Sequence, residues 1–226
     1  MAHRTLVAQA LTPDHEALTL SLEHGQHVVR VRGEVLMSSR VSGSEAALAK
    51  LAFPARPNSK VSRVLVGGLG MGFTLRAVLD ELGPLAQIDV LELLAEVVAW
   101  NRGVLAAYAQ QPLDDPRVEV IVQDVLAHLA TLTLPYDAIV LDIDNGPEPF
   151  TVAANSRLYT PHGLALLYGA LRAGGVVVVW SAFKSPRFEQ RLRNAGFFAS
   201  SVTVRARGAI GKGARHTVFK AVRPSR

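Results

Sequence analysis

The chain of 226 residues contains no cysteine. This absence excludes disulfides, thiolate metal sites and cysteine nucleophiles, and it fits a reducing compartment. The seven histidines show no His-x3-His or His-Glu-x2-His spacing, so no metal site is expected. No hydrophobic run reaches the roughly 18 residues of a membrane span. The segment Met1–Thr5 does not lead into the apolar core of a signal peptide. We therefore expect a cytoplasmic protein without a membrane partner.

The composition is that of a globular protein, with 49% hydrophobic and 19% charged residues. A chain of this length can bury the core of one large domain and a small appendage. The net charge of +5 comes mostly from arginine, much of it between Arg187 and Arg226. Exposed surface arginine is the ordinary explanation, and a footprint for nucleic acid or an anionic substrate is the alternative.

A glycine-rich turn between an apolar strand and a helix is the most informative motif. It runs Gly-Gly-Leu-Gly-Met-Gly over residues 67–72. Glycine permits positive φ and a close approach of backbone N–H groups to a ligand, and the following helix N-terminus favours negative charge. Glu92 stands 92 − 72 = 20 positions after Gly72, at the end of the next apolar run, where a carboxylate can accept from ribose hydroxyls. Together these features predict a nucleotide-binding half-unit, whereas the glycines alone are equally typical of a packing turn.

Carboxylates also follow the next two apolar runs. The run 118–122 is followed by Asp124, and the run 136–141 by Asp142 and Asp144. Open α/β sheets bind ligands at the carboxyl ends of their strands. The sequence therefore predicts a ligand site at that edge of the sheet.

Strand and helix patterns alternate from residue 61 onward, which predicts a parallel sheet with helices on both faces. The predicted helices span residues 74–82, 95–109, 125–132, 161–172 and 188–195, and two segments at 199–204 and 216–222 form a closing hairpin. Period-two alternation at 17–23 and 27–32 predicts an N-terminal hairpin, and a short helix at 46–53 ends at Pro54. We expect a small β-rich region with a short helix at residues 1–57, then a Rossmann-like domain at 58–226.

This order of elements resembles the class I S-adenosylmethionine-dependent methyltransferase fold, and within it the chain is similar to the spermidine synthase family. The resemblance covers roughly Arg30 to Trp180. Its blocks are the glycine turn with Thr74-Leu75-Arg76, Leu91-Glu92, Asp115-Pro116-Arg117-Val118 with Gln123-Asp124, and Leu158-Tyr159-Thr160 through Gly174-Gly175. It implies a mostly parallel seven-stranded sheet with a C-terminal antiparallel hairpin, a small N-terminal β-hairpin region and a homodimer.

The resemblance also implies roles for individual residues. Glu92 would bind the ribose, Asp124 and Val125 the adenine, and the turn with Gly68, Gly70 and Gly72 the tail of S-adenosylmethionine or its decarboxylated form. Asp142 would stand beside the attacking amine and accept its proton, supported by Asp144. The alternative for both carboxylates is a loop cap bonded to backbone N–H groups. The substrate-binding residues would be Asn145 and Tyr159. Tyr159, Trp180 and Phe183 would wall the acceptor pocket, or serve as core packing.

Three departures from the family pattern bear on the substrate. Met71 stands where the family has an aspartate in the glycine turn, and the family's second amine-binding carboxylate is either replaced by Asn145 or displaced to Asp144. Gly43-Ser44-Glu45 stands where the family has Tyr-His-Glu. Each of the first two removes a partner for a cationic amine, which a buried ammonium needs. This favours a donor that carries its own carboxylate, such as intact S-adenosylmethionine.

The sequence therefore predicts a transferase that moves an aminopropyl or methyl group to a small amine-type acceptor. One alternative is a methyltransferase acting on RNA or another macromolecule, which the basic C-terminal third favours and the lack of a nucleic-acid module disfavours. The other is a non-catalytic nucleoside-binding relative.

Overall fold

The computed structural model describes residues 4–40, 43–53, 62–143, 146–147, 153–206 and 213–225. A smaller sheet is formed by β1 (Arg4–Leu11), β2 (Ala17–Glu23), β3 (Gln26–Val31) and β4 (Glu34–Ser38). A larger sheet is formed by β5 (Arg63–Gly67), β6 (Gln87–Glu92), β7 (Val118–Val122), β8 (Tyr136–Leu141), β9 (Leu171–Ser181), β10 (Phe198–Arg205) and β11 (Arg215–Val222). The α-helices are α1 (Gly43–Ala52), α2 (Phe73–Glu81), α3 (Ala95–Arg102), α4 (Val125–Ala130), α5 (Pro161–Ala170) and α6 (Pro186–Asn194).

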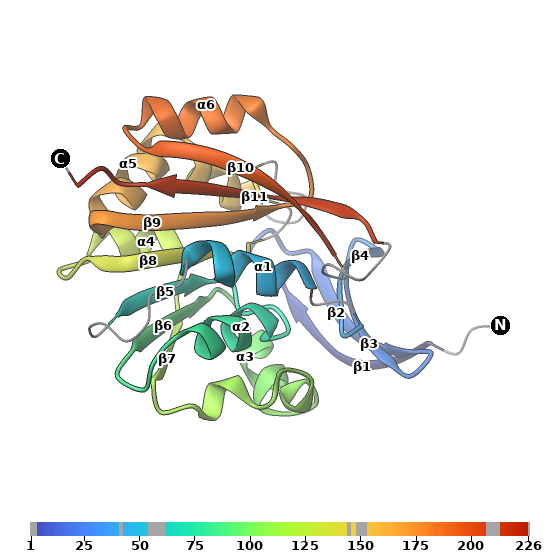
Figure 1. Cartoon of the computed structure of the whole chain (residues 1–226). Coiled ribbons are helices and arrows are strands. Elements are labelled where there is room, and N and C mark those ends of the chain that lie inside the picture. The colour runs from blue at the N-terminus through green and yellow to red at the C-terminus, as the bar shows by residue number, and fades with distance from the viewer. Residues whose placement is uncertain are drawn as a thin grey trace.

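The larger sheet has the strand order β10-β11-β9-β8-β5-β6-β7 (Figure 1). β5 pairs in parallel with both β6 and β8, β9 continues in parallel beside β8, and β11 and β10 form the antiparallel hairpin. The order reverses at the pair β5–β8, which is the topological switch point where α/β sheets bind ligands. The predicted seven-stranded, mostly parallel α/β fold is confirmed.

Helices cover both faces of the larger sheet. One core contains residues of α1, α2 and α3, among them Leu48, Leu75 and Val98. The core on the other face contains residues of α4, α5 and α6, among them Leu126 and Phe188. No described helix is long and apolar enough to cross a membrane.

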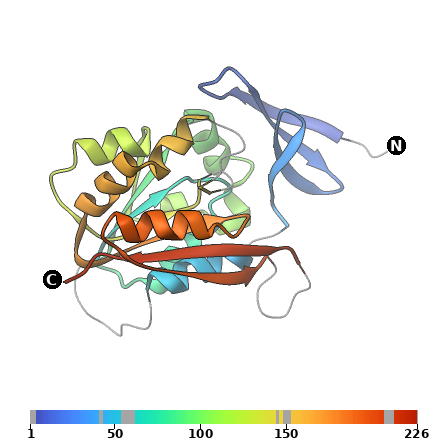
Figure 2. The same ribbon diagram turned by 90° about the horizontal axis from the view of Figure 1, so that it is seen from above.

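The smaller sheet stands at one side of the larger one (Figure 2). Its buried residues pack on the glycine turn and on α3, in a cluster that includes Leu20, Val29, Met71 and Trp100. The sequence predicted β2 and β3. It missed β1 and β4, whose residues are mostly exposed or half-buried and show no clean alternation.

The helix predicted at 46–53 begins earlier, at Gly43, and belongs to the core of the larger sheet through Leu48, Ala49 and Ala52. It therefore packs with the Rossmann-like domain and not with the β-rich region to which the sequence division assigned it. The boundary proposed at residue 57 lies outside the described residues.

Two further boundaries differ from the sequence prediction. The helix expected at 95–109 ends at Arg102, and a separate 3-10 helix follows at Ala106–Ala109, because Gly103 leaves the helical region with φ −116° and ψ −113°. β9 begins at Leu171, where the predicted helix was still running, because Leu171 is buried and pairs with Tyr136 of β8.

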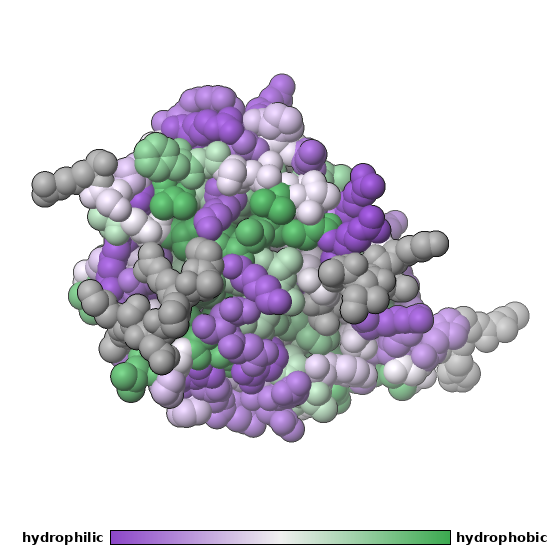
Figure 3. All heavy atoms as spheres, in the orientation of Figure 1, coloured by the Kyte–Doolittle hydropathy of each residue, from purple (hydrophilic) through white to green (hydrophobic). Residues whose placement is uncertain are grey.

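Polar side chains of α6 cover the upper edge of the molecule, and a hydrophobic band crosses the face below it, in the region of β10 and β11 (Figure 3). Two residues of the edge strand β10, Phe198 and Val202, are exposed.

Gly68 gives a test of the turn that joins β5 to α2. Its φ is +87°, and a Cβ there would lie 2.4 Å from the carbonyl oxygen of Asp142. Gly33 has a similar φ of +82°, but a Cβ at Gly33 would meet nothing within 4 Å, which makes it a matched control. We expect Gly33→Ala to lower the free energy of unfolding by about 1–2 kcal/mol, and Gly68→Ala by at least about 3 kcal/mol. Urea denaturation measures both, and equal losses would contradict the close approach.

Candidate active site

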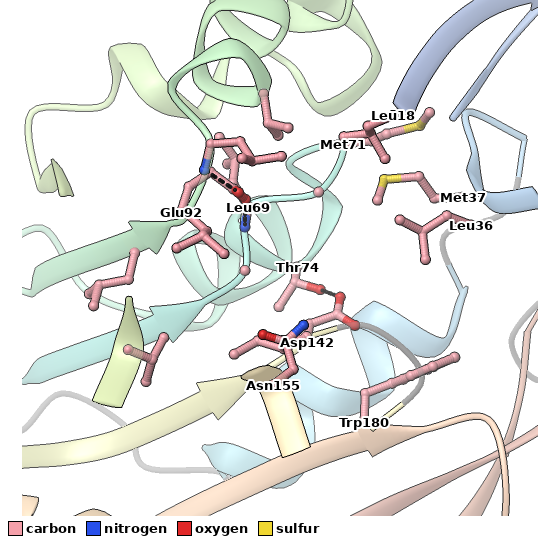
Figure 4. A pocket seen from close by; sticks show the side chains of 18 of the residues that line it. Leu18, Leu36, Met37, Leu69, Met71, Thr74, Glu92, Asp142, Asn155 and Trp180 are labelled. Carbon is pink, nitrogen blue, oxygen red and sulfur yellow. Dashed lines mark hydrogen bonds between the residues drawn. The ribbon is translucent and has the colours of Figure 1, made fainter. Parts of the chain in front are cut away.

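A cavity of about 480 Å³ opens at the carboxyl ends of the central strands. It is bounded by the glycine turn after β5, by the residues that follow β6, β7 and β8, by the start of α1 and by β4 of the smaller sheet (Figure 4). This position at the switch point, and its mostly apolar lining with a few polar groups, are typical of small-molecule sites.

The glycine turn forms the floor of the cavity. Gly68, Gly70 and Gly72 all have positive φ, at 87°, 54° and 83°. The Asn101 side chain fixes the turn by donating a hydrogen bond of 2.8 Å to the carbonyl oxygen of Gly70. The turn also approaches β8 closely, because the Asp142 N–H donates to the carbonyl oxygen of Gly67 at 2.9 Å. All three predicted glycines therefore have the backbone conformation that the motif requires, and Gly68 and Gly70 line the cavity.

Glu92 lies at the end of β6 and lines the cavity. One carboxylate oxygen accepts from the Leu69 N–H at 3.1 Å, and the other from the Leu94 N–H at 3.0 Å. These bonds fix the carboxylate, and each oxygen keeps a further acceptor site for a ligand hydroxyl. Burial raises the pKa of Glu92, and the backbone N–H donors oppose that shift.

Asp124 and Val125 line the same cavity at the end of β7. Asp124 is the N-cap of α4, where it accepts from the Ala127 N–H at 2.9 Å. This cap bond orients the aspartate at the cavity rim, and Val125 adds a buried apolar surface beside it.

Asp142 lies at the end of β8, where its carboxylate accepts a hydrogen bond of 2.5 Å from the Thr74 hydroxyl of α2. Burial raises the pKa of Asp142, and the Thr74 hydrogen bond opposes the shift. The partner is a side chain from another element, so the geometry differs from that of the loop cap considered as the alternative. Asp144 and Asn145, predicted to support catalysis and to bind substrate, lie outside the described residues.

Glu45 is a cavity residue that the sequence reasoning did not select. It lies in the first turn of α1, where the Ser44 hydroxyl donates to its carboxylate at 2.9 Å. Burial raises the pKa of Glu45 to about 7, and the negative charge of Asp142 adds to the shift. Two carboxylates thus face one cavity, an arrangement that favours a cationic ligand. One sequence feature could have identified Glu45 as a cavity residue: it stands at the glutamate of the family's Tyr-His-Glu block.

Met71 is buried in an apolar wall shared with the smaller sheet. Figure 4 shows Met71 close to Leu18, Met37 and Leu36, across the cavity from Thr74 and Asp142. The hydrophobic side chain at this position therefore also packs the smaller sheet onto the glycine turn.

Of the three aromatic residues expected to wall the acceptor pocket, only Trp180 lines the cavity. Tyr159 is 1% exposed and packs edge-on against Phe188, with ring centroids 5.4 Å apart. Its predicted contact with substrate is therefore corrected to a core contact. Successive side chains of a 3-10 helix point about 120° apart, so in Ala153–Tyr159 the neighbouring Leu158 lines the cavity in its place. Phe183 is 63% exposed and lies outside the lining.

No group of three or more histidine, aspartate or glutamate side chains arranged to hold a metal ion occurs in the part of the chain that the structure describes.

Two solved structures resemble the whole described chain. A spermidine synthase in complex with the transition-state analogue AdoDATO has a TM-score of 0.78, with 18% identity over 98% of this chain and 75% of that one. The spermidine synthase from Thermotoga maritima has a TM-score of 0.74, with 17% identity over 98% of this chain and 73% of that one. At these identities the likeness shows the shared fold.

Curated relatives match part of the sequence. Polyamine aminopropyltransferase 2 of Pseudomonas aeruginosa is 36% identical over 51% of this chain and 32% of its own length. Polyamine aminopropyltransferase 1 of Hyperthermus butylicus is 31% identical over 56% of this chain and 42% of its own length. The polyamine aminopropyltransferase of Mycobacterium tuberculosis is 31% identical over 65% of this chain and 29% of its own length. The chain thus matches less than half the length of each of these relatives.

The spermine/spermidine synthase domain matches residues 45–195. This range is well over half of the chain, and it contains the glycine turn, Glu92, Asp124 and the half-buried carboxylates Glu45 and Asp142. The chain belongs to the spermine/spermidine synthase domain family.

Proposed function

We propose that the chain transfers an aminopropyl group from decarboxylated S-adenosylmethionine to a small amine. The observation that carries this proposal is a single cavity lined by the glycine turn, by Glu92 and by the half-buried carboxylates Asp142 and Glu45. Relatives named polyamine aminopropyltransferases support the same reaction class.

The donor would lie along the switch point. Glu92 would accept hydrogen bonds from the ribose hydroxyls through its remaining lone pairs, and Asp124 and Val125 would contact the adenine. The glycine turn would place its backbone against the sulfonium arm. A cytoplasmic location and a homodimer remain predictions.

The chemistry needs little covalent help from the protein. The amine nitrogen attacks the carbon beside the sulfonium, a C–N bond forms, and the C–S bond breaks to release the neutral thioether methylthioadenosine. The nitrogen loses one proton, which Asp142 would accept, and Glu45 is the second carboxylate on this side of the cavity. Raised pKa values make these carboxylates stronger bases than exposed ones, and a carboxylate in its ionised form would attract the protonated amine before the reaction.

Methyl transfer from intact S-adenosylmethionine is the second candidate, and the apolar wall at Met71 favours it. The tail of this donor carries its own carboxylate, which backbone N–H groups of the glycine turn could bind without an aspartate at position 71. A macromolecular acceptor and a non-catalytic nucleoside-binding role remain the alternatives with least support.

Product analysis separates these reactions. We expect the purified protein, given decarboxylated S-adenosylmethionine and an amine, to release methylthioadenosine and an amine heavier by one aminopropyl group, detected by mass spectrometry. Release of S-adenosylhomocysteine from intact S-adenosylmethionine would establish the second candidate. Binding of a donor without either product, over a panel of amines, would contradict the transferase proposal.

Replacement of the proposed base tests the mechanism. We expect Asp142→Asn to lower kcat by about 10²–10⁴-fold, because an amide cannot accept the proton, while the donor still binds. Calorimetric titration with methylthioadenosine checks donor binding in the variant. Glu119→Gln, an exposed carboxylate of β7 outside the cavity lining, is the control and should leave kcat unchanged. Full activity in Asp142→Asn would remove Asp142 from the mechanism.

The raised pKa of Glu45 makes a prediction for stability. The folded protein holds the Glu45 proton up to about pH 7, whereas the ordinary pKa of a glutamate is 4.5, so stability falls as pH rises between these values. The glutamine of the Glu45→Gln variant cannot ionise, so the variant does not lose free energy of unfolding in this way as the pH rises. We expect it to exceed the parent in free energy of unfolding by about 1–2 kcal/mol at pH 8, with no such gain at pH 4.5. Glu81→Gln, an exposed carboxylate at the end of α2, should show no such pH dependence. If Glu45→Gln changed the free energy of unfolding equally at pH 4.5 and pH 8, the raised pKa of Glu45 would be refuted.

A further inference from the structure

Two buried polar atoms, on residues that line the cavity, have no partner in the described part of the chain. They are the indole Nε1 of Trp180 on β9 and the Nδ1 of His216 on β11. Both residues line the cavity, and their rings meet edge to face with centroids 4.6 Å apart. Buried polar atoms are almost always hydrogen-bonded in native proteins. The pair therefore indicates a ligand group that would satisfy both atoms.

The fold places these rings on the same side of the sheet as Glu45. Val178 and Val218, which lie two positions from Trp180 and His216 along their strands, pack in one core with α1. Alternate residues of a strand share a face, so both rings face the side that α1 covers. The N–H of Gly43, at the start of α1, donates to the carbonyl oxygen of Ala206 just beyond β10 at 2.9 Å, which ties the helix start to the hairpin. Trp180 and Asp142 lie on the same side of the cavity in Figure 4.

The two groups of the cavity have opposite chemical preferences. Asp142 and Glu45 are acidic and suit an ammonium group. The indole N–H only donates, and burial lowers the pKa of His216, so its ring is neutral and offers one donor and one acceptor. An ammonium has no lone pair with which to accept from the indole N–H, whereas a hydroxyl or carboxylate oxygen has one.

We propose that Trp180 and His216 bind an oxygen atom of the acceptor, so that the acceptor is a primary amine with a hydroxyl or carboxylate at its other end, and not a diamine. The amino end would face Asp142 and Glu45, and the oxygen would accept from the indole N–H. This inference rests on the proposed function in taking the cavity as the acceptor site.

Binding of three amines with four-carbon chains tests the inference separately from catalysis. The full chain is titrated calorimetrically with 4-amino-1-butanol, 4-aminobutanoate and 1,4-diaminobutane, in the presence and absence of methylthioadenosine. We expect at least one oxygen-bearing amine to bind about tenfold or more tightly than the diamine, because it satisfies the indole donor. The preferred compound of the two distinguishes a hydroxyl from a carboxylate.

Variants link the preference to the rings. Trp180→Phe keeps an aromatic ring and removes the donor, and we expect it to reduce the preference to about threefold or less. His216→Phe provides a second, independent variant. Trp100→Phe, at the only other tryptophan and outside the cavity lining, should retain the preference.

The outcomes for the two proposals differ. Tighter binding of the diamine, or a preference that persists in both Trp180→Phe and His216→Phe, would overturn the inference and leave aminopropyl transfer intact. Absence of binding by all three amines would overturn the inference and also contradict the use of the cavity as an amine site. A ring-dependent preference for an oxygen-bearing amine, without any alkyl transfer to it, would support the inference and contradict the proposed function.

Discussion

The close approach between the glycine turn and the end of β8 is the constraint on which the rest of the site depends. Without a side chain at Gly68, the backbone after β5 can lie against the carbonyl of Asp142, where a Cβ would be 2.4 Å from the oxygen. This contact lies at the switch point, beside the cavity. It also brings Thr74 of α2 within hydrogen-bond distance of the Asp142 carboxylate. The floor of the cavity and its buried acid are thus positioned by the same turn.

The second feature of the site is its division by polarity. Asp142 after β8 and Glu45 at the start of α1 line one side of the cavity. The smaller sheet and Met71 provide an apolar wall across from Asp142 (Figure 4). A hydrophobic residue at position 71 packs the smaller sheet onto the turn, so the identity of this residue affects the fold and the chemistry of the site together. Low polarity around Asp142 and Glu45 keeps their protons bound to higher pH, because burial penalises the charged carboxylate.

The hairpin β10–β11 contributes to the site through a long-range contact. It pairs with β9 and thereby places His216 against Trp180, two residues separated by 36 positions in sequence (216 − 180). The indole Nε1 and the imidazole Nδ1 have no partner among the described residues, which is costly in a folded protein unless a ligand satisfies them. These two rings therefore give the cavity a preference for an acceptor that carries an oxygen atom. Neither the glycine turn nor the carboxylates provide this preference.

The sequence by itself determined the parallel sheet and the positions of Glu92, Asp124 and Asp142, because hydrophobic periodicity and the residues that end each strand are local signals. It did not determine that α1 packs on the larger sheet, that Glu45 lines the cavity or that Tyr159 is buried. Glu45 reads locally as an acidic residue in a helix's first turn, and Tyr159 is one residue from a cavity position on a 3-10 helix. Only the tertiary structure decided these points, since the contact of α1 with the larger sheet and the pairing of β11 with β9 join segments that are distant in sequence.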